Sequence, residues 1–530
     1  MVYTSKHTVP LPNLDVLTFL FDFPGSLAQE DTLLYADAHN PENGITKAQA
    51  RTLTRRIAHT LREHFSIGRN GPGKDVVVVI STGQFMLPAL FYGIIAAGGV
   101  ASLASPSFRP EELARQIDLG SAKLCISCAL TQDTLLAAAR ISGIPLHRCL
   151  VLQSGTPSSP WTLRQLTGSS HANLVGKGEL DWPRITSKDE LDNSLTCLLY
   201  SSGTTGPPKG VMLSHTNLIG LPLMTGRAMR EQWDRGDKFP YRTLAHLPTA
   251  HVAGVMDFLR FNEELEITVL FSVPPIFLLI AKSPAVKNQL KALRSVTSGA
   301  APMGKELQSE ASKKIGCVIA QTWGLSETTG SATVGDHEHA DSTGSVGALL
   351  PHVELRIVDE DGKDCPEGMP GEILIRGPTI TRGYYNNPQA NAESYHEGFL
   401  CTGDIGFFNR DLQLLYVVDR KKELIKYKGA QVAPAELEAT LLSHPLILDA
   451  GVIGVFSNEL ATEVPRAYVV ADSEKISAQE IQAFVKKSLA SYKQLRGGVV
   501  FVPAIPKSPS GKILRKELRA MAASSVKAKL

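Results

Sequence analysis

Short apolar runs alternate with helical segments up to about residue 350. VVVVI at 76–80 and VASLA at 100–104 enclose an apolar segment, while LCISC at 124–128 and CLVLQ at 149–153 enclose TLLAAAR. Such runs are typical of strands that are buried on both faces of a parallel sheet. The alternation therefore predicts an α/β architecture. Residues 154–170, which are rich in Gly, Ser, Thr and Pro, are predicted to form a surface loop.

After about residue 350 the pattern changes to short alternating strands with polar turns. VELRIVDEDG, GEILIRG and LQLLYVVDR predict a small antiparallel or barrel-like unit. From Asp419 the chain is rich in charge, and the helical pattern APAELEATLLSH is followed by two further strand candidates. We therefore place a boundary at residues 419–422, between an N-terminal domain of residues 1–418 and a C-terminal domain of residues 419–530.

Composition and the chain ends narrow the classes of function. A net charge of +2 over 530 residues gives no electrostatic basis for nucleic-acid binding. Seven cysteines are too sparse for a disulfide framework and indicate a reducing compartment. We expect no transmembrane segment, because Pro88 and Gly93 interrupt the most apolar stretch. Ala528-Lys529-Leu530 is a one-residue variant of the Ser-Lys-Leu signal, so we expect a peroxisomal import receptor as partner and a peroxisomal location, with the cytoplasm as the alternative.

One glycine-rich loop predicts phosphate binding. YSSGTTGPPKG, from Tyr200 to Gly210, combines small residues with Lys209, so that backbone N–H groups and a cation can converge on an anion. It is not a Walker A loop, because Ser or Thr would have to follow the lysine directly, and Gly210 follows it here. The loop therefore predicts a phosphate site of another kind.

Several further motifs occur in a characteristic order after this loop. They are SGAAP at 298–302, QTWGLSETTG at 321–330, CTGDIG at 401–406, VVDRKKE at 417–423, KYKGAQVAPAELE at 426–438 and PKSPSGKILRKEL at 506–518. Together they resemble the adenylate-forming superfamily over nearly the whole chain, and within it the acyl-CoA ligase branch of 4-coumarate–CoA ligases and firefly-type luciferases. The resemblance implies an α/β fold: a large N-terminal domain of two α/β subdomains and a small β-barrel-like subdomain, followed by a small, mobile α+β C-terminal domain.

The resemblance implies a nucleotide site for ATP, with Mg²⁺ as cofactor. Glu327, with Thr205, would bind Mg²⁺, because a hard cation prefers oxygen ligands. Trp323 would stack on adenine, Asp404 and Arg420 would contact ribose, and Lys512 would stabilise the charge that builds on phosphorus during adenylation. The implied ATP- and AMP-binding set is Ser201, Ser202, Gly203, Thr204, Thr205, Gly206, Lys209, Gln321, Thr322, Trp323, Ser326, Asp404, Arg420 and Lys512.

A second set of implied residues belongs to coenzyme A and to the acid. Lys428 and Gly429 would contact coenzyme A, the co-substrate, and Lys426 and Gln431 match catalytic positions. Lys422 matches the hinge about which the small domain would rotate between two half-reactions. The catalytic set is thus Lys512, Lys426, Gln431 and His251, and the acyl pocket is lined by His251, Ala253, Ala301 and Thr322. Ala253 cannot donate the hydrogen bond that the coumarate ligases give to the 4-hydroxyl group, which counts against coumarate as substrate.

The chain departs from the family pattern after Val255. His251 and SGAAP are closer together than expected, by roughly 20 residues, about one helix and one strand. Either the acyl pocket is rebuilt and widened, or the protein is impaired. We expect an AMP-forming ligase for an aryl or medium- to long-chain hydrophobic acid. The alternatives are an adenylation enzyme that loads a separate carrier protein, a luciferase-like oxygenase and an impaired nucleotide-binding homologue.

Overall fold

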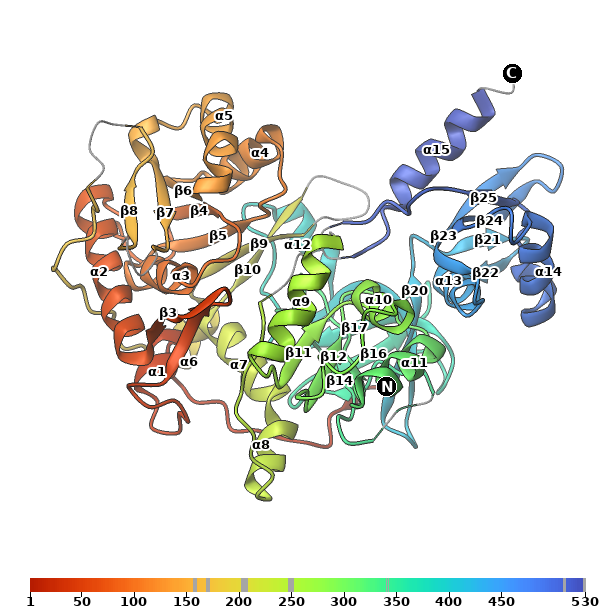
Figure 1. Ribbon diagram of the computed structural model, residues 1–530, viewed down its shortest axis with the longest axis horizontal. Helices are drawn as coiled ribbons and strands as arrows, with labels where there is room; N and C mark the ends of the chain where they lie inside the picture. Colours follow the sequence, from red (N-terminus) through yellow and green to blue (C-terminus); the bar gives the residue numbers. More distant parts are fainter. Residues whose placement is uncertain are drawn as a thin grey trace.

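A large domain and a small domain follow one another along the chain (Figure 1). The computed structural model describes residues 1–155, 160–167, 172–201, 208–245, 252–339, 341, 343–508 and 511–527. No helix in these described ranges is long and apolar enough to cross a membrane. The large domain contains three main sheets, and the predicted fold class is confirmed.

The first subdomain is built on a seven-stranded sheet. Its order is β10-β9-β5-β4-β6-β7-β8, with parallel pairing except at the two edge strands. Alternate residues of β4 pack on α2 and α3 on one face and on α4 and α5 on the other (Figure 1). The bounds are β4 Val76–Ile80, β5 Val100–Ala104, β6 Leu124–Cys128, β7 Cys149–Gln153, β8 Thr162–Gln165, β9 Cys197–Ser201, β10 Lys209–Leu213, α2 Lys47–Phe65, α3 Leu87–Ala96, α4 Pro110–Gly120 and α5 Gln132–Ser142.

The prediction of a loop over residues 154–170 is wrong for part of that range. Thr162–Gln165 forms the edge strand β8, antiparallel to β7, with Leu152 opposite Leu163. Leu163 is fully buried among the residues that pack on this face of the sheet. One buried leucine and the free edge of β7 therefore outweigh the polar composition of the segment.

The second subdomain holds the parallel sheet β11-β12-β13. Helices α9, α10 and α11 accompany its strands, and Phe258, Phe277 and Ala311 from these helices share one core with β11, β12 and β13. SGAAP begins at the last residue of β12, and QTWGLSETTG begins at the last residue of β13, so both motifs leave the same edge. The bounds are α9 Val252–Glu264, β11 Val269–Ser272, α10 Pro274–Lys282, β12 Ser295–Ser298, α11 Lys305–Ile315 and β13 Ile319–Gln321.

An antiparallel six-stranded sheet completes the large domain. Its order is β1-β16-β17-β19-β18, with β20 paired to β19. The sequence patterns predicted β16, β17 and β20, whereas the long strand β19 was not predicted. The bounds are β1 Tyr3–Thr4, β16 Glu354–Val358, β17 Gly371–Arg376, β18 Tyr395–His396, β19 Phe399–Asn409 and β20 Leu414–Arg420. The shorter elements of this domain include α1 Val16–Asp22, β2 Leu33–Asp37, β3 Asn40–Thr46, α6 Lys188–Asn193, α7 His215–Thr225, α8 Arg227–Asp234, β14 Thr333–Val334, β15 Ala348–Leu349 and α12 Pro388–Ser394.

The small domain starts after β20 and has its own core, whereas Asp419 and Arg420, which the predicted boundary assigns to the C-terminal domain, pair with β19 in the large-domain sheet. The hairpin β21–β22 and the helices α13 and α14 pack on the sheet β23-β24-β25. Figure 1 shows this domain beside the large one, with α15 projecting from it. A Cβ atom built on Gly304 would lie 3.1 Å from Ala439 Cβ, so α13 faces the start of α11. The bounds are β21 Ile425–Tyr427, β22 Ala430–Val432, α13 Pro434–Leu442, β23 Ile447–Ser457, β24 Thr462–Ala471, α14 Ala478–Ser488, β25 Val499–Phe501 and α15 Arg515–Lys527.

Candidate active site

Asp404, Trp323 and Arg420 form a connected group between the sheets of the large domain. Asp404 lies on β19 directly opposite Arg420 on β20. Its Oδ2 accepts a 2.8 Å hydrogen bond from Trp323 Nε1, and its Oδ1 lies 3.3 Å from Arg420 Nε. Burial raises the pKa of Asp404, while Arg420 and the indole N–H act in the opposite direction. The group is thus a buried carboxylate held by one hydrogen bond and one ion pair, and a carboxylate can accept hydrogen bonds from hydroxyl groups.

Trp323 and its neighbours Thr322 and Gln321 are fixed by packing and by hydrogen bonds within the protein. The Trp323 ring is only 7% exposed and packs into the core of the antiparallel sheet, so stacking on adenine stays a prediction. Thr322 donates to the carbonyl of Thr333 at 2.6 Å, and Gln321 Nε2 donates to Gln308 Oε1 at 3.0 Å. Thr322 also lies against the SGAAP turn, because a Cβ atom on Gly299 would be 2.8 Å from its methyl group. The predicted acyl-pocket residues Ala301 and Thr322 are therefore on adjoining turns.

Glu327, Tyr384 and Lys209 form a second group. Glu327 lies in the 3₁₀ turn Ser326–Thr328, and its Oε1 accepts a 2.9 Å hydrogen bond from the Tyr384 hydroxyl. Lys209 Nζ lies 4.7 Å from the centre of the Tyr384 ring, a cation–π contact. Burial and Glu327 together raise the pKa of Tyr384, which keeps its hydroxyl protonated. Tyr384 thus links the end of the phosphate loop to the predicted Mg²⁺ ligand.

Sequence reasoning did not single out Tyr384. A signal was present, because TRGYYNN at 381–387 places two aromatic residues in a polar turn after a buried strand. The residues present fit a magnesium ion that takes most of its ligands from phosphate and water, since Glu327 supplies one carboxylate. Elsewhere in the described ranges, no group of three His, Cys, Asp or Glu side chains is placed to hold a metal.

Lys512 projects from the small domain toward both groups. Its loop is closed by the bridge between Lys507 and Ile513 and by a 2.8 Å bond from Ser508 N to the carbonyl of Lys512. The charges that act on the lysine are those of Arg420, Asp404 and Glu327. Although the Lys512 side chain is partly exposed, desolvation beside the large domain, followed by repulsion from Arg420, lowers its pKa, and the two carboxylates oppose this. The structure therefore brings Lys512 together with the predicted ribose and Mg²⁺ ligands.

Lys426, Lys428, Gly429 and Gln431 share one hairpin elsewhere on the small domain. Lys426 is paired with Gln431, and Tyr427 with Ala430, which leaves Lys428 and Gly429 as a two-residue turn. Their φ angles of 46° and 83° are typical of the primed turns that join twisted strands. Lys428 N donates to Thr462 Oγ1 at 2.9 Å, and Arg496 lies over the Tyr427 ring, so the supporting contacts are within the small domain. All four residues are exposed.

The remaining predicted positions cannot be compared with the structure. Ser202, Gly203, Thr204, Thr205, Gly206, His251 and the tripeptide Ala528-Lys529-Leu530 lie outside the described residues. Ser201 is described as the last residue of β9 and Ala253 as part of α9, in both cases for the backbone alone. Lys422 lies in the turn between β20 and β21.

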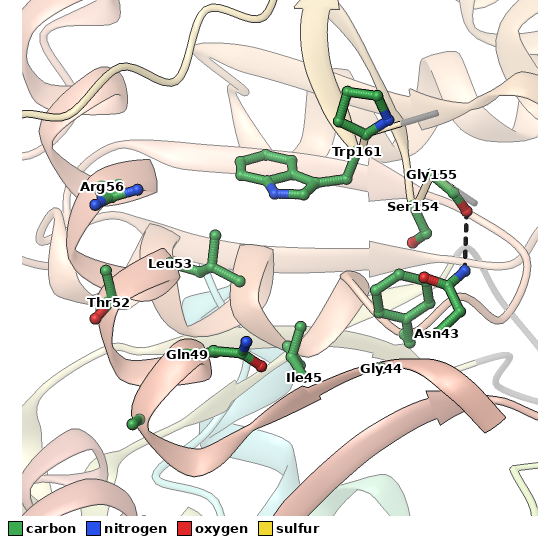
Figure 2. Close-up of a pocket in the computed structure, with 13 residues that line it drawn as sticks. Asn43, Gly44, Ile45, Gln49, Thr52, Leu53, Arg56, Ser154, Gly155 and Trp161 are labelled. Carbon is green, nitrogen blue, oxygen red and sulfur yellow. Dashed lines mark hydrogen bonds between the residues drawn. The ribbon is translucent and has the colours of Figure 1, made fainter. Parts of the chain in front are cut away.

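A separate cavity of about 480 Å³ lies in the first subdomain (Figure 2). Trp161, Leu53 and Ile45 contribute apolar walls. Two of its polar side chains are engaged by the protein: Asn43 Nδ2 donates to the carbonyl of Gly155, and Ser154 Oγ donates to Gln84 Oε1. It contains none of the predicted site residues, and the predicted nucleotide-site groups lie around Asp404 and Glu327 instead.

Comparison with known families matches most of the chain. The family described as AMP-binding enzyme matches residues 28–261 and 256–385, and the AMP-binding enzyme C-terminal domain matches residues 436–512. The first family is matched in two stretches that overlap at residues 256–261. A break in the match at this place fits a chain that lacks a piece of the family pattern after Val255.

Individual relatives agree with this result. A protein of Emericella nidulans, named as an acyl-coenzyme A synthetase, is 45% identical over 555 aligned positions that cover 99% of each chain. The phenylacetyl-CoA ligase epaB of Aspergillus niger is 35% identical over 98% of each chain. ATP-bound MatB from Rhodopseudomonas palustris superposes with a TM-score of 0.79 at 25% identity, covering 96% of this chain and 99% of MatB. The chain therefore belongs to the AMP-binding, adenylate-forming enzymes, in their acyl-CoA ligase branch, and is an ATP-dependent acid–thiol ligase.

Proposed function

We propose that the acid is a hydrophobic one, either an aryl acid or a medium- to long-chain aliphatic acid. The observation that carries the proposal is the similarity, over 98% of both chains, to a phenylacetyl-CoA ligase. Ala253 supports it, because a methyl side chain offers a hydrophobic acid contact area and no hydrogen bond to a ring hydroxyl. Ala301 and Thr322, on adjoining turns, would line the same end of the acid.

In the first half-reaction the carboxylate oxygen attacks the α-phosphorus of ATP. The new O–P bond gives acyl-AMP, and the bond to the β-phosphate breaks to release pyrophosphate. Lys209 and the loop from Ser201 to Gly206 would hold the departing phosphates, and Asp404 with Arg420 would hold ribose. Mg²⁺, bound by Glu327, would neutralise phosphate charge. Lys512 would place its ammonium group beside the oxygens on which negative charge builds, and such stabilisation is often the largest single contribution to catalysis.

In the second half-reaction the thiol of coenzyme A attacks the acyl carbon. A C–S bond forms, the bond to AMP breaks, and the thiol proton is lost to solvent or a nearby base. We propose that the small domain rotates about Lys422, withdrawing Lys512 and presenting Lys428, Gly429, Lys426 and Gln431. The rotation is needed because the two lysine loops lie on different parts of the small domain and cannot both reach one acyl carbon.

A second candidate function is nucleotide binding without efficient ligation. The two-part family match favours it, since a helix and a strand that wall the acyl pocket would be absent. The alignment with the Emericella nidulans relative spans 555 positions against 530 residues here, so at least 555 − 530 = 25 positions face gaps.

For the first candidate, the acyl-CoA ligase, we propose that the acyl pocket is widened by this loss and still binds bulky hydrophobic acids.

Pyrophosphate release distinguishes these possibilities. Fatty, phenylacetic and cinnamic acids are each supplied with ATP and Mg²⁺, with and without coenzyme A, and thioester is measured in parallel. We expect pyrophosphate and thioester with at least one hydrophobic acid. ATP binding without pyrophosphate from any acid indicates the impaired homologue, whereas pyrophosphate that is indifferent to coenzyme A, without thioester, indicates an enzyme that loads a separate carrier. Omitting Mg²⁺ tests whether pyrophosphate release requires the ion.

We also propose peroxisomal import through Ala528-Lys529-Leu530. A fluorescent protein fused ahead of the full chain is expected to be peroxisomal, and the same fusion lacking the three residues is expected to stay in the cytoplasm. A cytoplasmic distribution of both fusions would contradict the proposal.

A further inference from the structure

A buried cluster of charges joins the two domains at the predicted hinge. Asp419, Glu423 and Glu438 are 6%, 7% and 8% exposed, and the two guanidinium groups of Arg515 and Arg519 lie among them. Buried carboxylates are retained only where donors replace the water that they lose. The burial of these carboxylates therefore depends on each of their contacts. Only one of the three carboxylates precedes the predicted hinge residue Lys422 in the chain.

Asp419 is that carboxylate: it lies in the large domain and caps helix α13 of the small domain. It belongs to β20, opposite Ile405 in the large sheet. Its Oδ2 accepts a 2.9 Å hydrogen bond from the backbone N–H of Ala435, in the first turn of α13. The N-cap residue of α13 is Ala433, which has no side chain able to cap the helix. The large domain thus supplies the cap that α13 lacks, from across the hinge.

Arg515 ties the same cluster to the Lys512 loop. It lies three residues after Lys512, at the start of α15. One of its terminal nitrogens donates to both oxygens of Glu438, at 2.8 and 2.9 Å, and its Nε donates to the carbonyl of Val452 at 3.2 Å. These contacts stay within the small domain, so they would move with it. Burial raises the pKa of Asp419, and among the opposing influences the charge of Arg515 is the largest.

We propose that Asp419 is a latch, a positioning residue that favours the arrangement in which Lys512 reaches the nucleotide site. This inference rests on the proposed rotation about Lys422. In the docked arrangement Asp419 is bonded to Ala435 and is close to the positive charge of Arg515. Rotation carries both partners away, because they follow the hinge in the chain. The contacts of Glu423 with Arg519 and of Glu438 with Arg515 survive the same rotation, so Asp419 alone in this cluster distinguishes the two arrangements.

Asp419→Asn and Glu423→Gln form a matched pair of variants. Each replaces one buried carboxylate of the cluster by an amide of similar size, but only the first weakens a contact that crosses the hinge. Pyrophosphate release at saturating acid is measured alongside thioester formation from supplied acyl-AMP. For Asp419→Asn we expect pyrophosphate release to fall about tenfold, since a charge-assisted bond is lost from one arrangement only, with an unchanged KM for ATP. Thioester formation should be unchanged, and Glu423→Gln should leave the ratio of the two rates unaltered.

Trypsin cleavage tests the latch independently of activity. The hinge offers Lys421 and Lys422, both exposed, and release of the small domain should make the segment easier to cleave. We expect faster cleavage there in Asp419→Asn than in the wild type and in Glu423→Gln. Equal cleavage in all three proteins, or equal losses in both half-reactions, would overturn the latch. If the wild type releases no pyrophosphate with any acid, the proposed function fails, whereas the cleavage result still decides the latch. Asp419→Ser, which keeps an oxygen acceptor, serves if Asp419→Asn does not fold.

Discussion

The two lysine loops of the small domain are built alike but are supported differently. Lys512 and Lys428 each project from a tight turn closed by antiparallel backbone bonds. The groups that surround Lys512 come from the large domain: Arg420, Asp404 and Glu327. The Lys428 turn is supported by Thr462 and Arg496 of its own domain. One loop is therefore complete only when the domains are docked, and the other keeps its shape in any orientation.

This difference would allow one site to serve the two proposed half-reactions. A loop whose electrostatic partners lie across a hinge acts in one arrangement of the domains. A loop that is prefolded on a rigid hairpin can be delivered to the acyl carbon without reorganising, which spares the ordering entropy that a flexible segment would lose on delivery. Changes at Lys512 should thus affect adenylation, and changes at the Lys428 turn should affect thioester formation.

Lys512→Ala is expected to have the largest effect. Removing the ammonium group from beside the α-phosphate should lower the rate of adenylation by roughly 10²–10³, the usual range for a preorganised group that stabilises transition-state charge. ATP–pyrophosphate exchange measures this step. Thioester formation from supplied acyl-AMP is the control and should change little. Equal losses in both measurements would mean that the two loops do not act in separate half-reactions.

A cross-link between the domains should give the opposite result. In the double variant Gly304→Cys/Ala439→Cys the two Cβ atoms start about 3.1 Å apart, slightly closer than in a disulfide, so a small adjustment suffices. Oxidation would hold Lys512 at the nucleotide site. Thioester formation should then fall by roughly tenfold or more, because rotation is blocked, while pyrophosphate exchange persists.

Reduction and the single variants control this experiment. Dithiothreitol should restore thioester formation to the double variant, and neither single cysteine should respond to oxidation. The native Cys317, Cys365 and Cys401 are partly exposed, so the single variants also report any cross-link that these form. Full thioester formation by the oxidised double variant would exclude the proposed rotation.

Gly429→Ala probes the other loop with a smaller expected effect. Gly429 has a φ of 83°, and a Cβ atom there would meet nothing within 4 Å, so the cost comes from the backbone alone. An alanine in this left-handed conformation costs about 1–2 kcal/mol, and the turn should shift to relieve it. We expect thioester formation to fall roughly five- to tenfold, with unchanged pyrophosphate exchange. A matched Gly316→Ala, at a φ of 78° after α11 and also without close neighbours, should cost similar stability but spare both reactions.

The sequence predicted the secondary structure better than the contacts between side chains. Buried strands such as Val76–Ile80 have continuous apolar patterns, which is why their bounds agree with the structure. Edge strand β8 escaped prediction, because a polar strand is stabilised by its neighbour and not by its own pattern. Motifs identified Asp404, Glu327 and Lys512 as candidates. Tyr384 and Arg515 contact partners more than 50 residues away in the chain, and Asp419 bonds to Ala435, 16 residues on and in a different element, so these contacts could not be derived from local spacing.

The pH dependence of adenylation tests the electrostatic difference between the Lys512 and Lys428 loops, with the smallest expected effect. Lys512 would have to be protonated to stabilise phosphate charge, and desolvation and repulsion by Arg420 lower its pKa below the ordinary value of 10.5. The rate of pyrophosphate exchange should therefore fall as the pH rises through that lowered pKa, because the lysine loses its charge there.

Lys512→Arg shows whether that decline belongs to this residue. A guanidinium group stays charged throughout the range, so the variant should exchange pyrophosphate more slowly but without the alkaline decline. Asp404 and Glu327 favour the charged lysine, and their effect requires that the domains be docked. The cross-linked, oxidised protein should accordingly show the same alkaline decline in exchange as the wild type. A decline that persists unchanged in Lys512→Arg would come from another group, and would remove the electrostatic difference on which the comparison of the two loops depends.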